Sequence, residues 1–150
     1  MSVKNLFLFV VLLNFYQEVF LQDIFVSNLD DKCLRCLCVA SSNCDINFPC
    51  TDGFCGPYLL SKPYYDDATK GRDMDPTKKA FEKCALDYTC AKKIVKYYVA
   101  RFAKDCNKDG VTDCTDYAMI NFNGGYGCEL DLFRSAYGRQ YAERYYNCSI

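Results

Sequence analysis

Apolar residues recur at three- and four-residue intervals along much of the chain, and the pattern is strongest in one segment. Cys90, Ile94, Tyr98 and Phe102 follow one another at i, i+4 spacing. In a helix this spacing places the four side chains on one face, while the lysines between them point elsewhere. The pattern predicts a helix that begins at Thr89 or Cys90 and turns this stripe toward the core.

Four further helices are predicted from shorter stretches of the same periodicity. Capping and stop signals set their ends, including a first-turn proline at one start and an asparagine followed by two glycines at one stop. The last of these helices is less regular because it contains a glycine. The predicted ranges are 28 to about 40–43, with Asn43 as the stop, then 75–86, 113–122 and 130–146.

The segments between the predicted helices are rich in turn residues. Residues 44–60 contain two prolines and two glycines, which predicts either a small β-hairpin region or an irregular loop pinned by disulfides. Residues 66–75 are polar and predict an exposed loop. No repeat or linker divides the chain. The fold class expected from this pattern is α+β, predominantly helical, with a small β lobe in one compact domain.

The start of the chain has the pattern of an export signal. Lys4 precedes an apolar run of roughly eight residues, which is too short to cross a bilayer. The sequence predicts a signal peptide over residues 1–22, cut somewhere between about 16 and 27, and a secreted domain over residues 28–150. The alternative is an uncleaved signal anchor. After cleavage we expect an extracellular protein with no membrane contact.

Cysteine is unusually frequent, with 12 in 150 residues. An even count in an exported chain predicts six disulfides, although spacing alone leaves their connectivity open. The close spacing of the first three cysteines also fits a zinc half-site, which an oxidising compartment disfavours. The predicted disulfide cysteines are Cys33, Cys36, Cys38, Cys44, Cys50, Cys55, Cys84, Cys90, Cys106, Cys114, Cys128 and Cys148.

Charge and composition exclude several function classes. The formal net charge is −1, whereas a nucleic-acid-binding surface needs an excess of positive charge. The chain also contains no histidine, which excludes Ser-His-Asp and Cys-His catalysis and His-ligated zinc. Acid–base chemistry would have to use carboxylates, lysine, tyrosine or cysteine.

The ordered cysteines and their neighbours carry a family resemblance. The set closely resembles the invertebrate-type lysozyme family, also called the destabilase family, and looks most like its insect branch. The matching motifs are Cys33-Leu-Arg-Cys36-Leu-Cys38, Cys55-Gly-Pro-Tyr58, Pro63-Tyr-Tyr65, Cys114-Thr-Asp-Tyr-Ala118 and Asn123-Gly-Gly-Tyr-Gly-Cys128. The resemblance implies a disulfide-rich, lysozyme-like domain that is a monomer and requires no cofactor.

The resemblance also implies a glycoside hydrolase. Active members of the family hydrolyse the β-1,4 bonds between N-acetylmuramic acid and N-acetylglucosamine in bacterial peptidoglycan, in antimicrobial defence or in digestion. This glycosidase chemistry uses two carboxylates that flank the bond, one protonated and one ionised. Peptidoglycan or a related glycan is therefore the implied partner.

This sequence departs from the family pattern at one of the two implied carboxylates. The family's acid is a glutamate between the third and fourth cysteines, and Ser41 stands at that position here. The implied second carboxylate is Asp52, whose alternative role is to form a turn with the glycine after it. Asp45 and Asp67 are the alternatives for the missing acid. Two functions therefore stay open: a secreted lysozyme, and a non-catalytic glycan-binding or structural module on the same fold.

One acidic segment matches a calcium-binding loop. Its oxygen-bearing side chains alternate around a glycine as in an EF-hand, and such hard oxygens are the ligands that calcium prefers. The alternative is a disulfide-tied acidic turn in which Asp113 caps the next helix. The candidate ligands are Asp105, Asn107, Asp109, Asp113 and Asp116.

Overall fold

The computed structural model describes residues 26–148. The predicted signal peptide over residues 1–22 lies outside this range. The helices are α2 (Asp31–Ser42), α3 (Lys62–Thr69), α4 (Lys78–Leu86), α5 (Tyr88–Phe102), α6 (Cys114–Asn123) and α7 (Ala136–Tyr146), with a 3-10 turn, η1, at Leu132–Arg134. Strands β1 (Phe54–Cys55) and β2 (Leu60–Ser61) pair antiparallel. In this part of the chain no helix is both long and apolar enough to cross a membrane.

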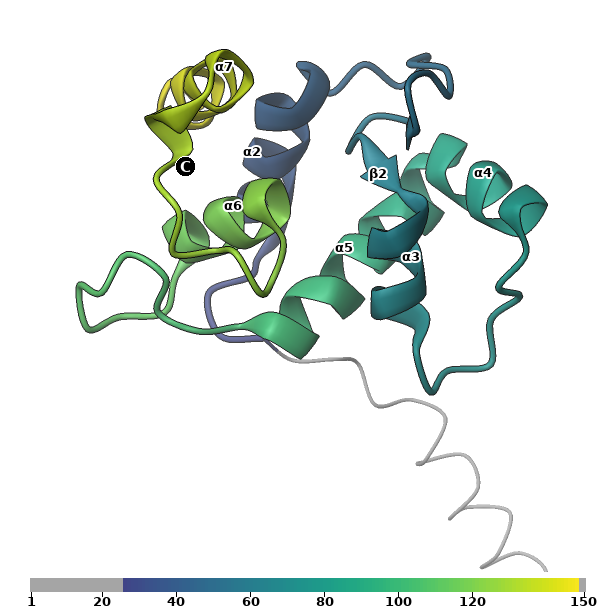
Figure 1. Ribbon diagram of the computed structural model, residues 1–150, viewed down its shortest axis with the longest axis horizontal. Coiled ribbons are helices and arrows are strands. Elements are labelled where there is room, and N and C mark those ends of the chain that lie inside the picture. The colour runs from purple at the N-terminus through teal and green to yellow at the C-terminus, as the bar shows by residue number, and fades with distance from the viewer. Residues whose placement is uncertain (1–25, 149–150) are drawn as a thin grey trace, which may run out of the picture.

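The helices form two groups joined by α5 (Figure 1). On one side lie α2, α6 and α7, and on the other lie the strands with α3 and α4. Helix α5 contacts α3, α4 and α6, so it belongs to both groups. Helix α2 packs against α7, which brings the beginning and the end of the described chain together. The predominantly helical α+β domain with a small β lobe is confirmed.

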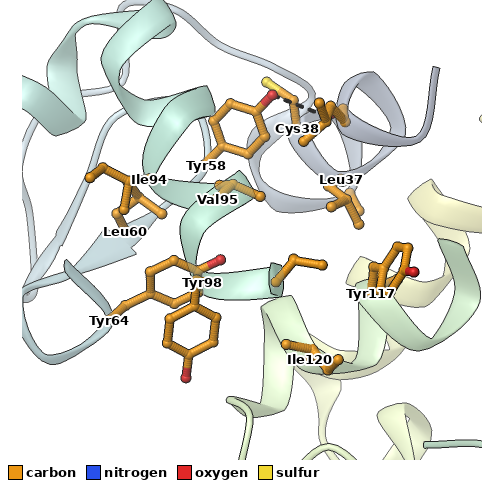
Figure 2. Close-up of a cluster of buried hydrophobic side chains, with 14 of the residues drawn as sticks. Leu37, Cys38, Tyr58, Leu60, Tyr64, Ile94, Val95, Tyr98, Tyr117 and Ile120 are labelled. Carbon is orange, nitrogen blue, oxygen red and sulfur yellow. Dashed lines mark hydrogen bonds between the residues drawn. The ribbon is translucent and has the colours of Figure 1, made fainter. Parts of the chain in front are cut away.

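Helix α5 bears out the strongest prediction from the sequence. It begins one residue earlier than predicted, because the Asp87 side chain accepts a hydrogen bond from the Cys90 backbone and caps the helix. Ile94 and Val95 are fully buried. Burying one such side chain contributes about 1.5–3 kcal/mol to stability. Figure 2 shows Ile94 and Val95 of α5 in the core cluster, with Leu60 of the lobe beside Ile94.

Helix α3 was not predicted, and it corrects the expected loop at residues 66–75. Ser61 caps the helix by accepting a hydrogen bond from the Tyr64 backbone, and a proline stands in its first turn. Both Tyr64 and Tyr65 are buried. The helix takes up only residues 66–69 of that stretch, where Asp66 is exposed while the helix packs on α5. Residues 70–75 form the predicted loop and are largely exposed.

The ends of three other helices differ from the prediction. Helix α2 stops at Asn43 as predicted but begins at Asp31, because the Asp30 side chain accepts the Cys33 backbone N–H and caps it there. Helix α4 begins at Lys78 with Thr77 as its cap, so the Asp75-Pro76 pair lies before it. The last predicted helix, 130–146, is divided into η1 and α7 by Ser135, which caps α7. Gly138 permits this break, since a Cβ there would lie 1.9 Å from the Leu132 carbonyl oxygen.

All twelve cysteines are paired, so the zinc half-site alternative is wrong. Three disulfides join distant segments and three close short loops of five or six residues. A disulfide that closes a longer loop constrains the unfolded chain more strongly. The pairs are Cys33–Cys114, Cys36–Cys148, Cys38–Cys44, Cys50–Cys55, Cys84–Cys90 and Cys106–Cys128.

Candidate functional site

Ser41 lies in the last turn of α2, just below the surface. The helix ends there because Asn43 adopts a left-handed conformation with φ of 59° and donates its backbone N–H to the Val39 carbonyl at 2.9 Å. The side chain of Ser41 is only 8% exposed, and its hydroxyl donates to the Leu37 carbonyl at 2.9 Å. Position 41, at which the resemblance predicts the family's acid, is therefore occupied by a small neutral group bonded to its own helix.

Asn121 of α6 connects Ser41 to two tyrosines. Its Nδ2 donates to the Ser41 hydroxyl at 3.3 Å and to the Tyr141 hydroxyl at 3.2 Å. Its Oδ1 accepts from the Tyr64 hydroxyl at 3.1 Å. Side chains from α2, α3, α6 and α7 thus converge in one neutral hydrogen-bond network, which we call the Ser41 network (Ser41, Tyr64, Asn121 and Tyr141).

The tyrosines of the Ser41 network are held in their neutral form. Both rings are buried, and burial raises the pKa of the Tyr64 and Tyr141 phenols above their ordinary value. Tyr64 also stacks on Tyr98, with ring centroids 3.6 Å apart, and Figure 2 shows the two rings side by side. A phenol with a raised pKa is a weaker proton donor, so neither tyrosine replaces a carboxylic acid.

One charged group lies beside this network. Arg144 of α7 donates from Nη1 to the Ser41 backbone carbonyl at 3.2 Å. Its positive charge would favour the ionised form of any carboxylate placed at this position.

The structure places Asp52 in a different environment. It occupies a two-residue turn with Gly53, where both residues have positive φ, 50° and 85°. Thr51 and Phe54 exchange backbone hydrogen bonds across this turn, which is the geometry that an Asp-Gly pair favours. The side chain of Asp52 is exposed and lines a pocket of about 320 Å³ that does not include Ser41. The turn role of Asp52 is therefore directly visible, while its catalytic role stays a prediction.

The alternative acids Asp45 and Asp67, and Asp66 beside the latter, lie in different surroundings. Asp45 is exposed and accepts the backbone N–H of Asn47 at 2.9 Å. Asp66 pairs with Lys62. Asp67 is half-buried on α3. Within residues 26–148, none of these carboxylates forms a hydrogen bond with the Ser41 network.

The first half of the acidic loop binds its own chain. Asp105 accepts the backbone N–H of Gly110 at 2.9 Å, and Asp109 accepts that of Val111 at 2.9 Å. The side-chain amide of Asn107 donates to Asp109 at 2.8 Å. These side-chain oxygens therefore order the backbone of the loop itself.

The second half of the loop is organised by Asp116, which is fully buried. Its Oδ1 accepts the backbone N–H groups of Cys106 at 2.7 Å and Asn107 at 3.2 Å, and its Oδ2 accepts that of Asp113 at 2.8 Å. Asp113 in turn caps α6 by accepting from Thr115. Across residues 26–148 there is no group of three or more acidic or cysteine side chains arranged to hold a metal ion. The geometry favours the acidic turn, and calcium binding stays a prediction.

Asn121 is the residue of this site that the sequence analysis missed. It lies four residues after the buried Tyr117, on the inward side of a helix that was predicted. A polar side chain at a core-facing helical position needs a buried hydrogen-bond partner. That rule would have singled it out, although its partners come from three other helices.

Comparisons with known proteins identify the family. Residues 30–148 match the family model described as Destabilase. The chain is 32% identical over 121 residues to invertebrate-type lysozyme 3 of Caenorhabditis elegans, covering 77% of this chain and 86% of that protein. It is 29% identical over 105 residues to a lysozyme of the oyster Magallana gigas, covering 68% and 71% of the two chains. These relatives leave the predicted likeness to the insect branch a prediction.

A solved structure shares the fold. It is the crystal structure of Aeromonas hydrophila PliI in complex with Meretrix lusoria lysozyme, matched at a TM-score of 0.59 and 22% identity over 83% of this chain and 97% of that one. At this identity the match supports the fold alone. Because the family model spans nearly all of the described residues and two thirds or more of the chain aligns with these lysozymes, this protein belongs to the destabilase family of invertebrate-type lysozymes.

Proposed function

We propose that this protein is a secreted, lysozyme-like protein that binds bacterial peptidoglycan without hydrolysing it as a classical muramidase. The observation that carries the proposal is the neutral Ser41 network at the position of the family's acid. The relatives are named as lysozymes, which supports peptidoglycan as the ligand class. The export pattern and six disulfides support an extracellular site of action.

The chemical argument concerns the leaving group. Cleavage of a glycosidic bond needs a proton donor beside the leaving oxygen, and a tuned carboxylic acid contributes about 10²- to 10⁴-fold to the rate. The hydroxyl of Ser41 is a far weaker acid and donates its proton to the Leu37 carbonyl. The neighbouring tyrosines have raised pKa values. No member of the Ser41 network supplies the missing step.

The proposal is tested with purified insoluble peptidoglycan. The parent protein is expected to sediment with peptidoglycan and to leave the turbidity of a peptidoglycan suspension unchanged. Loss of turbidity with the parent protein would overturn the non-catalytic assignment and would make Asp45 or Asp67 the first candidates for the acid. Failure to sediment would overturn peptidoglycan as the ligand.

A gain-of-function variant tests the role of position 41 directly. Ser41→Glu is expected to produce measurable turbidity loss, whereas the matched control Ser41→Gln, equal in size but without an acidic proton, is expected to produce none. The activity should have an acidic pH optimum, because the Arg144 guanidinium beside this position favours the ionised carboxylate. Asp52→Asn in the Ser41→Glu background should abolish the activity if Asp52 is the second carboxylate.

A further inference from the structure

Tyr126 is an aromatic side chain that is almost entirely exposed. It stands in the loop after α6, and 84% of its surface is accessible to solvent. Exposure of this degree leaves at least one face of the ring open. So little of the side chain is buried that the ring contributes little to the stability of the fold.

The loop that carries Tyr126 is rigidly anchored. The backbone N–H of Gly125 donates to the Tyr98 hydroxyl at 3.0 Å. A Cβ at Gly125 would lie 2.0 Å from Cγ of Phe102, so the loop lies directly on that ring. The Cys106–Cys128 disulfide fixes the far end of the loop. These contacts hold the backbone on both sides of Tyr126.

Tyr126 is also the outer end of a row of aromatic rings. Its ring meets Phe102 edge to face, with centroids 5.1 Å apart and planes at 71°. Phe102 contacts Tyr98 at 4.6 Å, and Tyr98 stacks on Tyr64 at 3.6 Å. The hydroxyl of Tyr64 belongs to the Ser41 network. The row therefore connects the position of the family's acid to an open ring at the surface.

A second exposed tyrosine shows that exposure alone does not explain this arrangement. Tyr137 on α7 is 81% exposed, almost as much as Tyr126. No aromatic ring contact of Tyr137 is found within residues 26–148. The two side chains match in type and accessibility and differ in whether they continue the row.

We infer that Tyr126 is a stacking platform for a sugar ring of the glycan strand, which extends glycan binding beyond the Ser41 network. The inference rests on the proposed function, because it assumes that the ligand is a glycan. The C–H groups on one face of a hexose ring are apolar and pack against an open aromatic face. A tyrosine offers this area with few rotatable bonds, and an anchored loop reduces the ordering cost further. The chain has no tryptophan that would serve instead.

The experiment measures binding isotherms on insoluble peptidoglycan for the parent and three variants. Tyr126→Ala is expected to weaken binding by about 3- to 10-fold, within the range of a single aromatic contact. Tyr126→Phe should bind within about twofold of the parent, because stacking does not use the hydroxyl. Tyr137→Ala, the matched control, should bind like the parent. Because both side chains are exposed, none of these substitutions should disturb the core. Equal melting temperatures of the parent and the variants would verify this.

The outcomes separate the inference from the proposed function. If the parent binds peptidoglycan and Tyr126→Ala binds equally well, the stacking role of Tyr126 is wrong, while the proposed function stands. If Tyr137→Ala loses as much affinity as Tyr126→Ala, adsorption through any exposed ring explains binding and the platform is again wrong. If the parent does not bind, both are overturned.

Discussion

Asp116 offers the most direct test of how the acidic loop is held. Its carboxylate is fully buried and accepts three backbone N–H groups, those of Cys106, Asn107 and Asp113. Replacing it with alanine removes both acceptor oxygens, and with them all three hydrogen bonds, and leaves the donors without partners. The donor of Cys106 is buried most deeply, because that residue is only 2% exposed.

The expected cost follows from these three bonds. A hydrogen bond to a charged group contributes about 1.5–3 kcal/mol, and a buried donor left unpaired costs about 1–3 kcal/mol. Water can reach Asn107 and in part Asp113, so their donors are partly satisfied after the change. We expect Asp116→Ala to lower the free energy of unfolding by about 3 to 5 kcal/mol. Asp116→Asn keeps one acceptor oxygen and should lose about 1 to 2 kcal/mol.

Thermal unfolding, followed by circular dichroism with the disulfides intact, measures this effect. At about 2–4 °C per kcal/mol for a chain of this size, Asp116→Ala should lower the melting temperature by about 6 to 20 °C. The control is Asp131→Ala, which removes the acceptor of one exposed N–H, that of Phe133, and should cost about 1 kcal/mol. Equal losses for the two alanine variants would refute the reasoning.

Three further predictions concern other parts of the molecule. Millimolar calcium should not shift the melting temperature of the parent, because the last candidate ligand of the loop, Asp116, is fully buried and already accepts three backbone N–H groups; an upward shift would support a calcium site. The Lys108 ammonium lowers the pKa of Glu129, so this ion pair stabilises the fold above the ordinary glutamate pKa and stops doing so as the pH falls through the lowered value. Glu129→Gln should therefore reduce the loss of stability that the protein shows below about pH 4.5. The control Glu143→Gln, which removes a glutamate without an ion pair in the described chain, should leave that loss unchanged. Gly125→Ala should displace its loop from Phe102 and weaken peptidoglycan binding as Tyr126→Ala does, whereas unchanged binding would show that the loop tolerates the Cβ.

The sequence predicted the elements whose signals are local. The stripe of α5 and the capping role of Asp113 each depend on a few neighbouring residues, and both are present in the structure. Helix α3 was not predicted because its eight residues include a proline and two adjacent aspartates, which are typical of a loop. What makes it a helix is the burial of Tyr64 against Tyr98 of α5 and of Tyr65 against Phe81 of α4, contacts between segments distant in the chain.

The residues of the candidate site also differ in whether the sequence signals them locally. Position 41 was singled out because the cysteines on either side of it suggest the alignment with the family, and that spacing is a local property of the sequence; its role stays a prediction. The role of Asn121 depends on partners that lie 80, 57 and 20 residues away. No periodicity within α6 encodes them, so the Ser41 network became visible only when the helices were placed in space.

The distribution of the disulfides has a consequence for survival among proteases. Cys33–Cys114 and Cys36–Cys148 both span the stretch from Gly56 to Lys83, where no cysteine occurs. That stretch includes the connection between α3 and α4, whose residues are largely exposed. A single cut there leaves two fragments that remain one covalent molecule, with α2 still tied to the segments that hold α6 and α7. One peptide-bond cleavage in this stretch therefore does not release a fragment.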